Sequence, residues 1–209
     1  MPKKRRYHHP DLRQALLDGA VRLIKAEGMR EFSLRKLAMQ VGVSHAAPYR
    51  HFDNKEAILA TLMLEGHKRL RTSLLDARAR CSGKAIDRLI AQGRAYLEFA
   101  RKNPEYLSVM FSREAMSAAR SMGEKLEFHH EDYDSFGVLE TTVSECQAEG
   151  AMDPRADTGA LSLHAWAEVH GLALLRNEGL IAGMSEMRGG KEARTLDAIF
   201  AIMRARFKA

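Results

Sequence analysis

The side chains with the clearest potential for chemistry lie between Arg35 and Lys55, where basic, hydroxyl and small residues follow closely on one another. Tyr49, His51 and Lys55 each provide a donor that can bond a phosphate oxygen, a contact that fixes position without reading sequence. Mostly small side chains precede them and would let a helix approach base edges closely. These residues are Ser44, His45, Ala46 and Ala47. The pattern favours nucleic-acid binding.

Two short helices joined by a turn would position these side chains, and the sequence predicts both. Ser33 can cap the first helix through its hydroxyl, and Gly42 can end it in the left-handed conformation of a tight turn. Ser44 can cap a second helix of barely two turns that ends near His51. The apolar face of the first helix is Leu34, Leu37, Ala38 and Val41. This is a helix-turn-helix, although an ordinary helical hairpin has a similar turn.

The segment from about Asp11 to about Met63 resembles, without a gap, the N-terminal domain of the tetracycline-repressor (TetR) family of bacterial one-component regulators. The resemblance is carried by SLRKLA, GVS, YRHF and the Lys that follows. It implies that the residues from Ser44 to Ala47 face the major groove of double-stranded operator DNA and that Arg35 can reach a base. It assigns phosphate contacts to Tyr49, His51 and Lys55, and the predicted interface also includes Arg50.

Pro48 departs from the family pattern, which usually has Leu, Ile or Val at this position. Proline has no backbone N–H and therefore removes an early hydrogen-bond donor from the second helix. We therefore expect this helix to open with a looser or 3₁₀-like turn.

The charge distribution points to the same partner independently of the motif. Residues 1–55 hold 12 Lys and Arg against 5 Asp and Glu, a balance of +7, whereas the whole chain carries +6. An excess of positive charge beside the helix-turn-helix suits phosphate neutralisation. The basic tail of residues 1–10 is expected to lie along the DNA backbone or in a minor groove, or else only to aid solubility. Its cations are Lys3, Lys4, Arg5 and Arg6.

Length and composition set the class of protein. A chain of 209 residues that is 45% hydrophobic can bury a full core, and its periodicity is helical almost throughout, which predicts an all-α fold. We expect a basic arm at 1–10, a three-helix DNA-binding domain at 11–56 and a larger ligand-binding and dimerisation domain at 57–209. No apolar run approaches the roughly 18 residues of a membrane span, which predicts a soluble, unexported, cytoplasmic protein without a membrane partner.

The apolar periods predict the individual helices. A first helix begins at Leu12 and ends near Gly28, and a long helix from about Lys55 to about Arg80 links the two domains. Five further helices follow, from Ile86 to about Asn103, from Tyr106 to Phe111, from Met116 up to Gly123, from Tyr133 to Ala148 and from Asp157 to Arg176. A last helix covers about Glu192–Phe207.

Trp166-Ala-Glu-Val-His170-Gly171 resembles the Trp-His-Gly motif of a group of C-terminal domains within the same family, and the stretch from Asn103 to Phe111 is similar to theirs. Gly171 permits close helix approach, while Trp166 and His170 share a helix face as a pocket wall, a subunit seam or an ordinary buried pair. Aromatic and Met side chains predict a pocket for a small hydrophobic or aromatic effector, although they also suit a plain core. The predicted lining is Tyr96, Phe99, Tyr106, Met110, Phe111, Met116, Trp166 and His170.

Recognition of two half-sites requires two recognition helices related by a two-fold axis, which predicts a homodimer. The family's usual interface corresponds to Tyr133–Ala148 and Asp157–Arg176, with Leu161 and Leu172 as interface residues. We expect a ligand-responsive transcriptional regulator, usually a repressor, that a small-molecule effector releases from a palindromic operator.

No catalytic, cofactor-binding or metal-binding signature is found, so we expect neither an enzyme nor a cofactor. His129-His130-Glu131-Asp132 has metal-capable side chains, but neighbours along a chain rarely close a tetrahedral site. His164 and Glu168 are better explained as a structural pair, and Cys81 and Cys146 lack metal-type spacing. The alternatives are a helical metal- or redox-dependent protein and an all-α binding module, each with incidental DNA binding.

Overall fold

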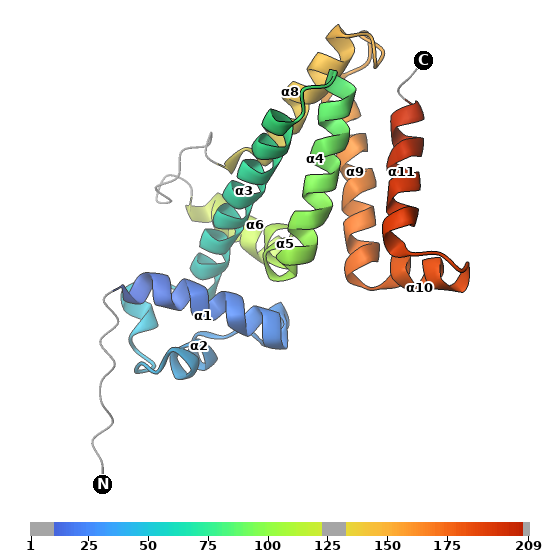
Figure 1. Cartoon of the computed structure of the whole chain (residues 1–209). Coiled ribbons are helices and arrows are strands. Elements are labelled where there is room, and N and C mark those ends of the chain that lie inside the picture. The colour runs from blue at the N-terminus through green and yellow to red at the C-terminus, as the bar shows by residue number, and fades with distance from the viewer. Residues whose placement is uncertain (1–10, 123–132, 207–209) are drawn as a thin grey trace. The chain divides into compact units, whose positions relative to one another are not determined.

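The computed structural model describes residues 11–122 and 133–206, and every regular element within them is a helix (Figure 1). The predicted all-α class is therefore confirmed. Close contacts divide the chain into two compact units. Unit 1 holds the described residues of Met1–Gly66 and Pro104–His129, and unit 2 those of His67–Asn103 and His130–Ala209. A domain boundary at 56/57 stays a prediction.

Unit 1 is built from α1, the 3₁₀ helix η1, α2, the 3₁₀ helix η2, the first part of α3, α5 and α6. Their bounds are Leu12–Glu27, Met29–Glu31, Leu34–Val41, Pro48–Arg50, Lys55–Arg80, Pro104–Met110 and Arg113–Met122. Asp11 caps α1, since its carboxylate accepts from the backbone N–H of Gln14 at 3.0 Å. The core is fully enclosed, with Leu16, Leu37 and Ile58 each at 0% exposure. Burial of these side chains holds α1, α2 and α3 together.

Unit 2 contains the rest of α3 together with α4, α8, α9, α10 and α11. The last five span Ala85–Lys102, Ser135–Ala148, Thr158–Asn177, Leu180–Met187 and Glu192–Arg206. Helix α4 packs against α8, α9 and α11 (Figure 1). A Cβ at Gly93 would lie 3.0 Å from Phe200 and 3.2 Å from Val169, so the absence of a side chain there lets α4 approach its neighbours. One core cluster joins α4 to α8 and comprises Ala85, Ile86, Leu89, Val143, Cys146 and Met152.

The predicted helices are found except for the second helix of the helix-turn-helix, where the chain forms the 3₁₀ helix η2 instead. Three other expectations need correction. Helix α8 begins at Ser135 rather than at Tyr133, because the Asp134 carboxylate caps it by accepting from Gly137 N–H at 2.7 Å. Helix α10 was missed, since it is short and only Ile181 and Ser185 are buried. No other helix among the described residues uses the close approach that Gly171 permits, because none of their atoms outside its own helix lies within 4 Å of a Cβ there.

No helix in the parts of the chain that the structure describes is both long and apolar enough to span a bilayer.

Candidate functional site

The turn after α2 has the geometry that the sequence predicted. The Ser33 hydroxyl accepts from the backbone N–H of Lys36 at 3.3 Å and caps α2. Gly42 follows α2 with φ +78°, a left-handed conformation that costs glycine little, and Val43 N–H bonds back to the Ala38 carbonyl at 3.0 Å. This closure fixes where the chain leaves α2.

The segment after this turn is not the two-turn α-helix that we expected. It is a turn followed by η2, and the Ser44 hydroxyl makes no capping bond, although the Ser44 carbonyl accepts from Ala47 N–H at 2.9 Å. The reason is Pro48, which lacks an N–H and stands at the first position of η2, with its ring buried in unit 1. The expected 3₁₀-like opening is therefore confirmed, whereas the Ser44 cap is wrong.

The predicted contact residues form an accessible surface at this segment. Seven of the nine are exposed, namely Arg35, Ser44, His45, Ala46, Tyr49, Arg50 and His51, and two are half-buried, namely Ala47 and Lys55. Tyr49 is 60% exposed, which is high for a large aromatic side chain. The basic arm, with Lys3, Lys4, Arg5 and Arg6, lies outside the described residues.

The basic side chains of this surface are uncommitted. Arg35, Arg50 and Lys55 make no ion pair with any residue in the described ranges, whereas Lys36 bridges Glu27 at 2.8 Å and Glu31 at 3.1 Å. Hydrogen bonds from these two carboxylates raise the pKa of Lys36. The three uncommitted cations can therefore neutralise phosphates without breaking an existing pair.

Two contacts hold the end of this surface in place. Asn54 caps α3, because its side-chain oxygen accepts from Ala57 N–H at 2.8 Å, and this sets Lys55 at the first position of the helix. Phe52 is buried, and the Arg13 guanidinium lies 5.2 Å from the centre of its ring. Lys55 thus projects from a helix N-terminus, which itself attracts anions.

A second candidate site, in unit 2, is a small polar cluster between α4 and α9. The Tyr96 hydroxyl lies 2.7 Å from Nδ1 of His170, and the Trp166 indole N–H donates to the same hydroxyl at 3.4 Å. The Trp166 and His170 rings are 5.1 Å apart, so the predicted shared face is confirmed. Phe136 meets Trp166 edge-on at 6.5 Å.

Burial sets the protonation states in this cluster. Desolvation raises the pKa of Tyr96 to about 12, against a smaller lowering effect of the Trp166 hydrogen bond. Desolvation also lowers the pKa of His170 below its ordinary value. We infer that Tyr96 donates to a neutral His170 while it accepts from Trp166, which satisfies both its donor and one acceptor position.

The sequence prediction missed Gln92, which lies one turn before Tyr96 on α4. It is 3% exposed, and neither its amide nitrogen nor its amide oxygen has a hydrogen-bond partner among the residues that the structure describes. A buried amide without partners costs about 1–3 kcal/mol, so this group is suited to pair with a bound molecule. The available signal was a polar residue within the buried face of α4, four residues from Tyr96.

The predicted pocket residues divide between the two units. Tyr96, Phe99, Trp166 and His170 belong to unit 2, whereas Tyr106, Met110, Phe111 and Met116 belong to unit 1. In unit 1, Tyr106 and Met110 pack against Gly66 of α3. Met116 is 40% exposed, and Phe99 is buried. The shared lining of these eight residues remains a prediction.

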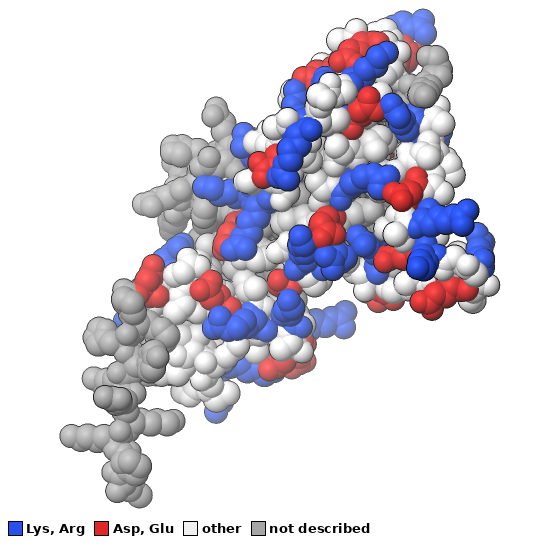
Figure 2. All heavy atoms as spheres, viewed as in Figure 1, with Lys and Arg blue, Asp and Glu red and all other residues white. Residues whose placement is uncertain are grey.

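Ion pairs in unit 2 connect α8 to α3 and α4. Arg78 of α3 donates to Glu145, and Arg88 of α4 donates to Glu145 at 3.0 Å and to Glu149 at 3.2 Å. Hydrogen bonds from Arg78 and Arg88 lower the pKa of Glu145, against desolvation. On the visible face, basic and acidic side chains are interspersed in the same way (Figure 2).

The metal and redox alternatives gain no support from the described residues. Among residues 11–122 and 133–206 there is no group of three or more His, Cys, Asp or Glu arranged to hold a metal ion. His129–Asp132 lie outside those ranges. His164 lies 3.7 Å from Glu168, and Glu168 also accepts from Arg206 at 2.5 Å, as expected of a structural pair. Cys146 is a free thiol, and burial raises its pKa to about 11, which disfavours the reactive thiolate.

A row of apolar side chains on unit 2 faces away from its own core. Leu163 and Leu174 on α9 are 53% and 48% exposed, and Ile202 on α11 is 61% exposed. Of the two residues that we placed at a subunit interface, Leu161 instead packs against the core cluster, and Leu172 is half-buried. The outward apolar residues of unit 2 include Leu163, Leu174, Leu175, Leu180, Met184, Met187 and Ile202.

Comparisons with known proteins agree with this arrangement. A family model described as bacterial regulatory proteins, tetR family, matches residues 16–62, and one described as tetracyclin repressor-like, C-terminal domain, matches residues 89–198. The nucleoid occlusion factor SlmA of Haemophilus influenzae is 31% identical over 110 residues, which are 52% of this chain and 50% of that protein. This chain thus spans about half the length of SlmA. The HTH-type transcriptional repressor Rv1474c of Mycobacterium tuberculosis is 30% identical over 127 residues, 57% of this chain and 67% of that protein.

Solved structures share the fold. A protein of unknown function from Rhodococcus sp. RHA1 superposes with a TM-score of 0.74 at 28% identity, covering 99% of this chain and 100% of that one. A TetR family regulator from Marinobacter aquaeolei VT8 gives a TM-score of 0.60 at 19% identity, over 80% of this chain and 84% of that one. Because the two family models together match both the helix-turn-helix and most of the helices after it, the chain belongs to the TetR family of bacterial regulatory proteins.

Proposed function

We propose that this protein is a homodimeric, ligand-responsive transcriptional repressor that binds a palindromic operator and is released by a small hydrophobic or aromatic effector. The observation that carries the DNA-binding part is the uncommitted basic surface of unit 1. Arg35, Arg50 and Lys55 have no ion pair within the described ranges, and Tyr49 is exposed beside them. Contacts of this kind to phosphates supply affinity, and the small residues before them allow close approach to bases.

Dimerisation is proposed from the exposed apolar residues of unit 2. On α9, Leu163 and Leu174 face outward from the fold of the single chain, as does Ile202 on α11. An apolar face of this kind is stable in water when a second copy covers it, and a two-fold pair presents two recognition segments to half-sites about 34–36 Å apart. Gly171, with open space beside it on α9, would let two copies approach closely.

The effector is assigned to the cluster around Tyr96, Trp166 and His170. Its ring faces favour an aromatic or apolar molecule, and the unpartnered amide of Gln92 favours one that also carries a hydrogen-bonding group. An effector acts only by binding one arrangement of the protein better than another. Helix α3 runs from Lys55 in unit 1 to Arg80 in unit 2, so a shift of this helix can carry the response, with an ordinary coupling of about 1–3 kcal/mol.

The DNA-binding part is tested by selecting duplexes from a random library with the full-length protein and measuring their affinity by fluorescence anisotropy. We expect the selected sequence to contain an inverted repeat and to bind at least about 1000-fold more tightly than a scrambled duplex at the same salt concentration. Equal affinity for both duplexes would contradict the proposal and would favour a binding module that uses DNA incidentally.

The effector part is tested with the compounds that release the protein from the selected duplex. Trp166 is the only tryptophan, so a compound bound at this cluster should change its fluorescence and raise the thermal stability of the DNA-free protein. Compounds that release DNA without either change, and instead compete with the duplex for unit 1, would overturn the allosteric account.

A further inference from the structure

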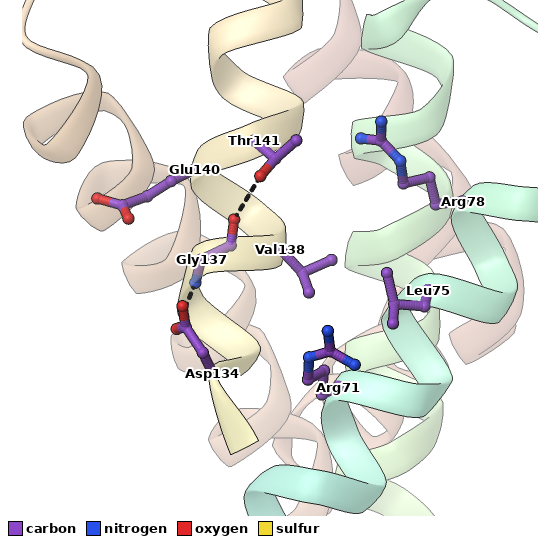
Figure 3. Close-up of a pocket in the computed structure, with 8 residues that line it drawn as sticks. All are labelled: Arg71, Leu75, Arg78, Asp134, Gly137, Val138, Glu140 and Thr141. Atoms are coloured by element: carbon purple, nitrogen blue, oxygen red, sulfur yellow. Dashed lines mark hydrogen bonds between the residues drawn. The ribbon is translucent and has the colours of Figure 1, made fainter. Parts of the chain in front are cut away.

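Unit 2 contains a cavity of about 510 Å³ between α3 and α8, separate from the aromatic cluster (Figure 3). Its size falls within the range of small-molecule sites. The lining consists of Arg71, Leu75, Arg78, Asp134, Gly137, Val138, Glu140 and Thr141. None of the residues of the aromatic cluster lines it, so a molecule bound here would make different contacts.

Two of the charged lining residues already have hydrogen-bond or ion-pair partners within the protein. Arg78 donates to Thr142 at 2.8 Å and pairs with Glu145, which neutralises its charge. Asp134 accepts from the backbone N–H of Gly137 at 2.7 Å, so one of its oxygens caps α8. Figure 3 shows the carboxylate of a third, Glu140, directed away from the α3 side of the cavity.

Of the two arginines in the lining, Arg71 is the one without a partner among the residues that the structure describes. It is half-buried, and it forms no hydrogen bond or ion pair with any residue in the described ranges. Figure 3 shows its guanidinium in the space between α3 and α8, below the side chains of Leu75 and Val138. A guanidinium offers a planar fork of donors that matches a carboxylate, and the two apolar side chains provide a short hydrophobic wall beside it.

We propose that this cavity binds a small organic anion, a carboxylate on a short hydrocarbon chain, with Arg71 as its counterion. The carboxylate pairs with the Arg71 guanidinium, and the chain packs against Leu75 and Val138. Binding here does not depend on the proposed regulatory function, and it adds a second ligand class to the one assigned to the aromatic cluster.

The test is calorimetric titration of the full-length protein with hexanoate, with hexanol, hexylamine and inorganic phosphate as comparison ligands. We expect hexanoate to bind most tightly, because only hexanoate combines the anionic group with the hydrocarbon chain. Arg71→Gln should weaken hexanoate binding roughly 10- to 100-fold, and Arg71→Lys should recover part of it, since a charge remains without the fork.

Arg188→Gln is the matched control, because Arg188 is an exposed arginine at the end of α10 in the same unit. This variant should bind hexanoate like the wild type. Equal hexanoate binding by the wild type and Arg71→Gln, or none by either, would overturn the proposal. Phosphate binding as tight as hexanoate would also overturn it, since the site would then select an anion without a chain. A failure of operator binding leaves this titration unchanged, so the two proposals fail separately.

Discussion

The two units of the chain differ in how many large apolar side chains they expose to water. Unit 1 encloses Leu16, Leu37 and Ile58 completely and presents basic and small side chains outside. Unit 2 leaves leucines such as Leu163 and Leu174 about half exposed while it buries the unpartnered amide of Gln92. Unit 1 leaves one buried side-chain atom, Glu105 Oε2, without a partner among the described residues, whereas unit 2 combines more exposed large apolar side chains with a whole buried amide to satisfy. From this difference we infer that the exposed apolar side chains of unit 2 suit a second copy of the chain, and that its buried amide suits a small molecule.

The two units also differ in the hydrogen bonding of their buried polar side chains. In unit 1 the buried hydroxyl of Thr61 donates to the Ala57 carbonyl at 2.8 Å, and buried Ser112 accepts from Ala115 N–H at 3.1 Å. Both groups are satisfied within their own chain segment. Gln92 in unit 2 has no such partner, since neither of its amide atoms bonds any described residue.

The largest expected effect follows from charging the exposed apolar face of unit 2. Leu174→Glu should raise the dimer dissociation constant by at least about a hundredfold, since an unpaired carboxylate buried at an interface costs several kcal/mol. Light scattering with in-line chromatography measures the mass of each variant. Met39→Glu is the control, because Met39 is 61% exposed in unit 1 and its variant should keep the wild-type mass. A monomeric wild-type protein at micromolar concentration would contradict dimerisation through this face.

Substitutions in the exposed surface of unit 1 distinguish residues that contact phosphates from residues that contact bases. Lys55→Ala should weaken binding to every duplex and reduce the salt slope of log affinity by about 1, and Tyr49→Phe should also act on all sequences. Arg35→Ala and His45→Ala should instead cost about 1–3 kcal/mol at particular base pairs and relax specificity there. Anisotropy titrations on the selected duplex and its single-base variants make this distinction. Uniform losses from all four substitutions would mean that none of them reads a base.

The sequence predicted the helix-turn-helix well because local physics fixes it. Ser33 and Gly42 cap the two ends of α2 through contacts with residues close to them in sequence. Pro48 predicted the 3₁₀ turn because a missing N–H changes only the hydrogen bonds of nearby residues. The details of unit 2 depend on packing between distant helices, which periodicity cannot resolve. Leu161 and Leu163 are two residues apart on one apolar helix, yet one faces the core and the other faces solvent.

The remaining omissions have the same origin. Gln92 and Arg71 are ordinary residues in sequence, and their importance comes from the absence of a partner in three dimensions. Helix α10 was missed because the eight residues Leu180–Met187 give too short a period to recognise. Sequence patterns thus located the helices and the residues of the aromatic cluster, while the cavity at Arg71 and the unpartnered amide of Gln92 required the fold.

A smaller effect is expected from removing the buried amide of unit 2. Gln92→Met keeps the length of the side chain and should raise the free energy of unfolding by about 1–3 kcal/mol, because it removes an unsatisfied polar group. Thr61→Val is the control in unit 1, where loss of a satisfied hydroxyl should lower the free energy of unfolding by roughly 1 kcal/mol. Urea unfolding at one fixed protein concentration measures both. A destabilised Gln92→Met would show that this amide is already satisfied, for example by water.

The smallest expected effect is a pH dependence carried by two half-buried histidines of unit 2. Desolvation lowers the pKa of His170, and it lowers the pKa of His67 against the opposing charge of Asp134. The unfolded chain therefore takes up protons near the ordinary histidine pKa of 6.5, while the folded chain does so only at lower pH. Since the unfolded state then binds more protons, the free energy of unfolding should fall as pH decreases below about 6.5.

This dependence is measured by urea unfolding at pH 8 and pH 5, with the wild type compared with His170→Gln. The variant carries no imidazole at this position, so it should lose less stability between the two pH values than the wild type does. His164→Gln is the control, because His164 is exposed on the same helix and its variant should follow the wild type. Equal losses in the wild type and His170→Gln would assign the pH dependence to other groups. A smaller loss in His170→Gln alone would show that unit 2 keeps this half-buried imidazole neutral, as donation from the Tyr96 hydroxyl requires.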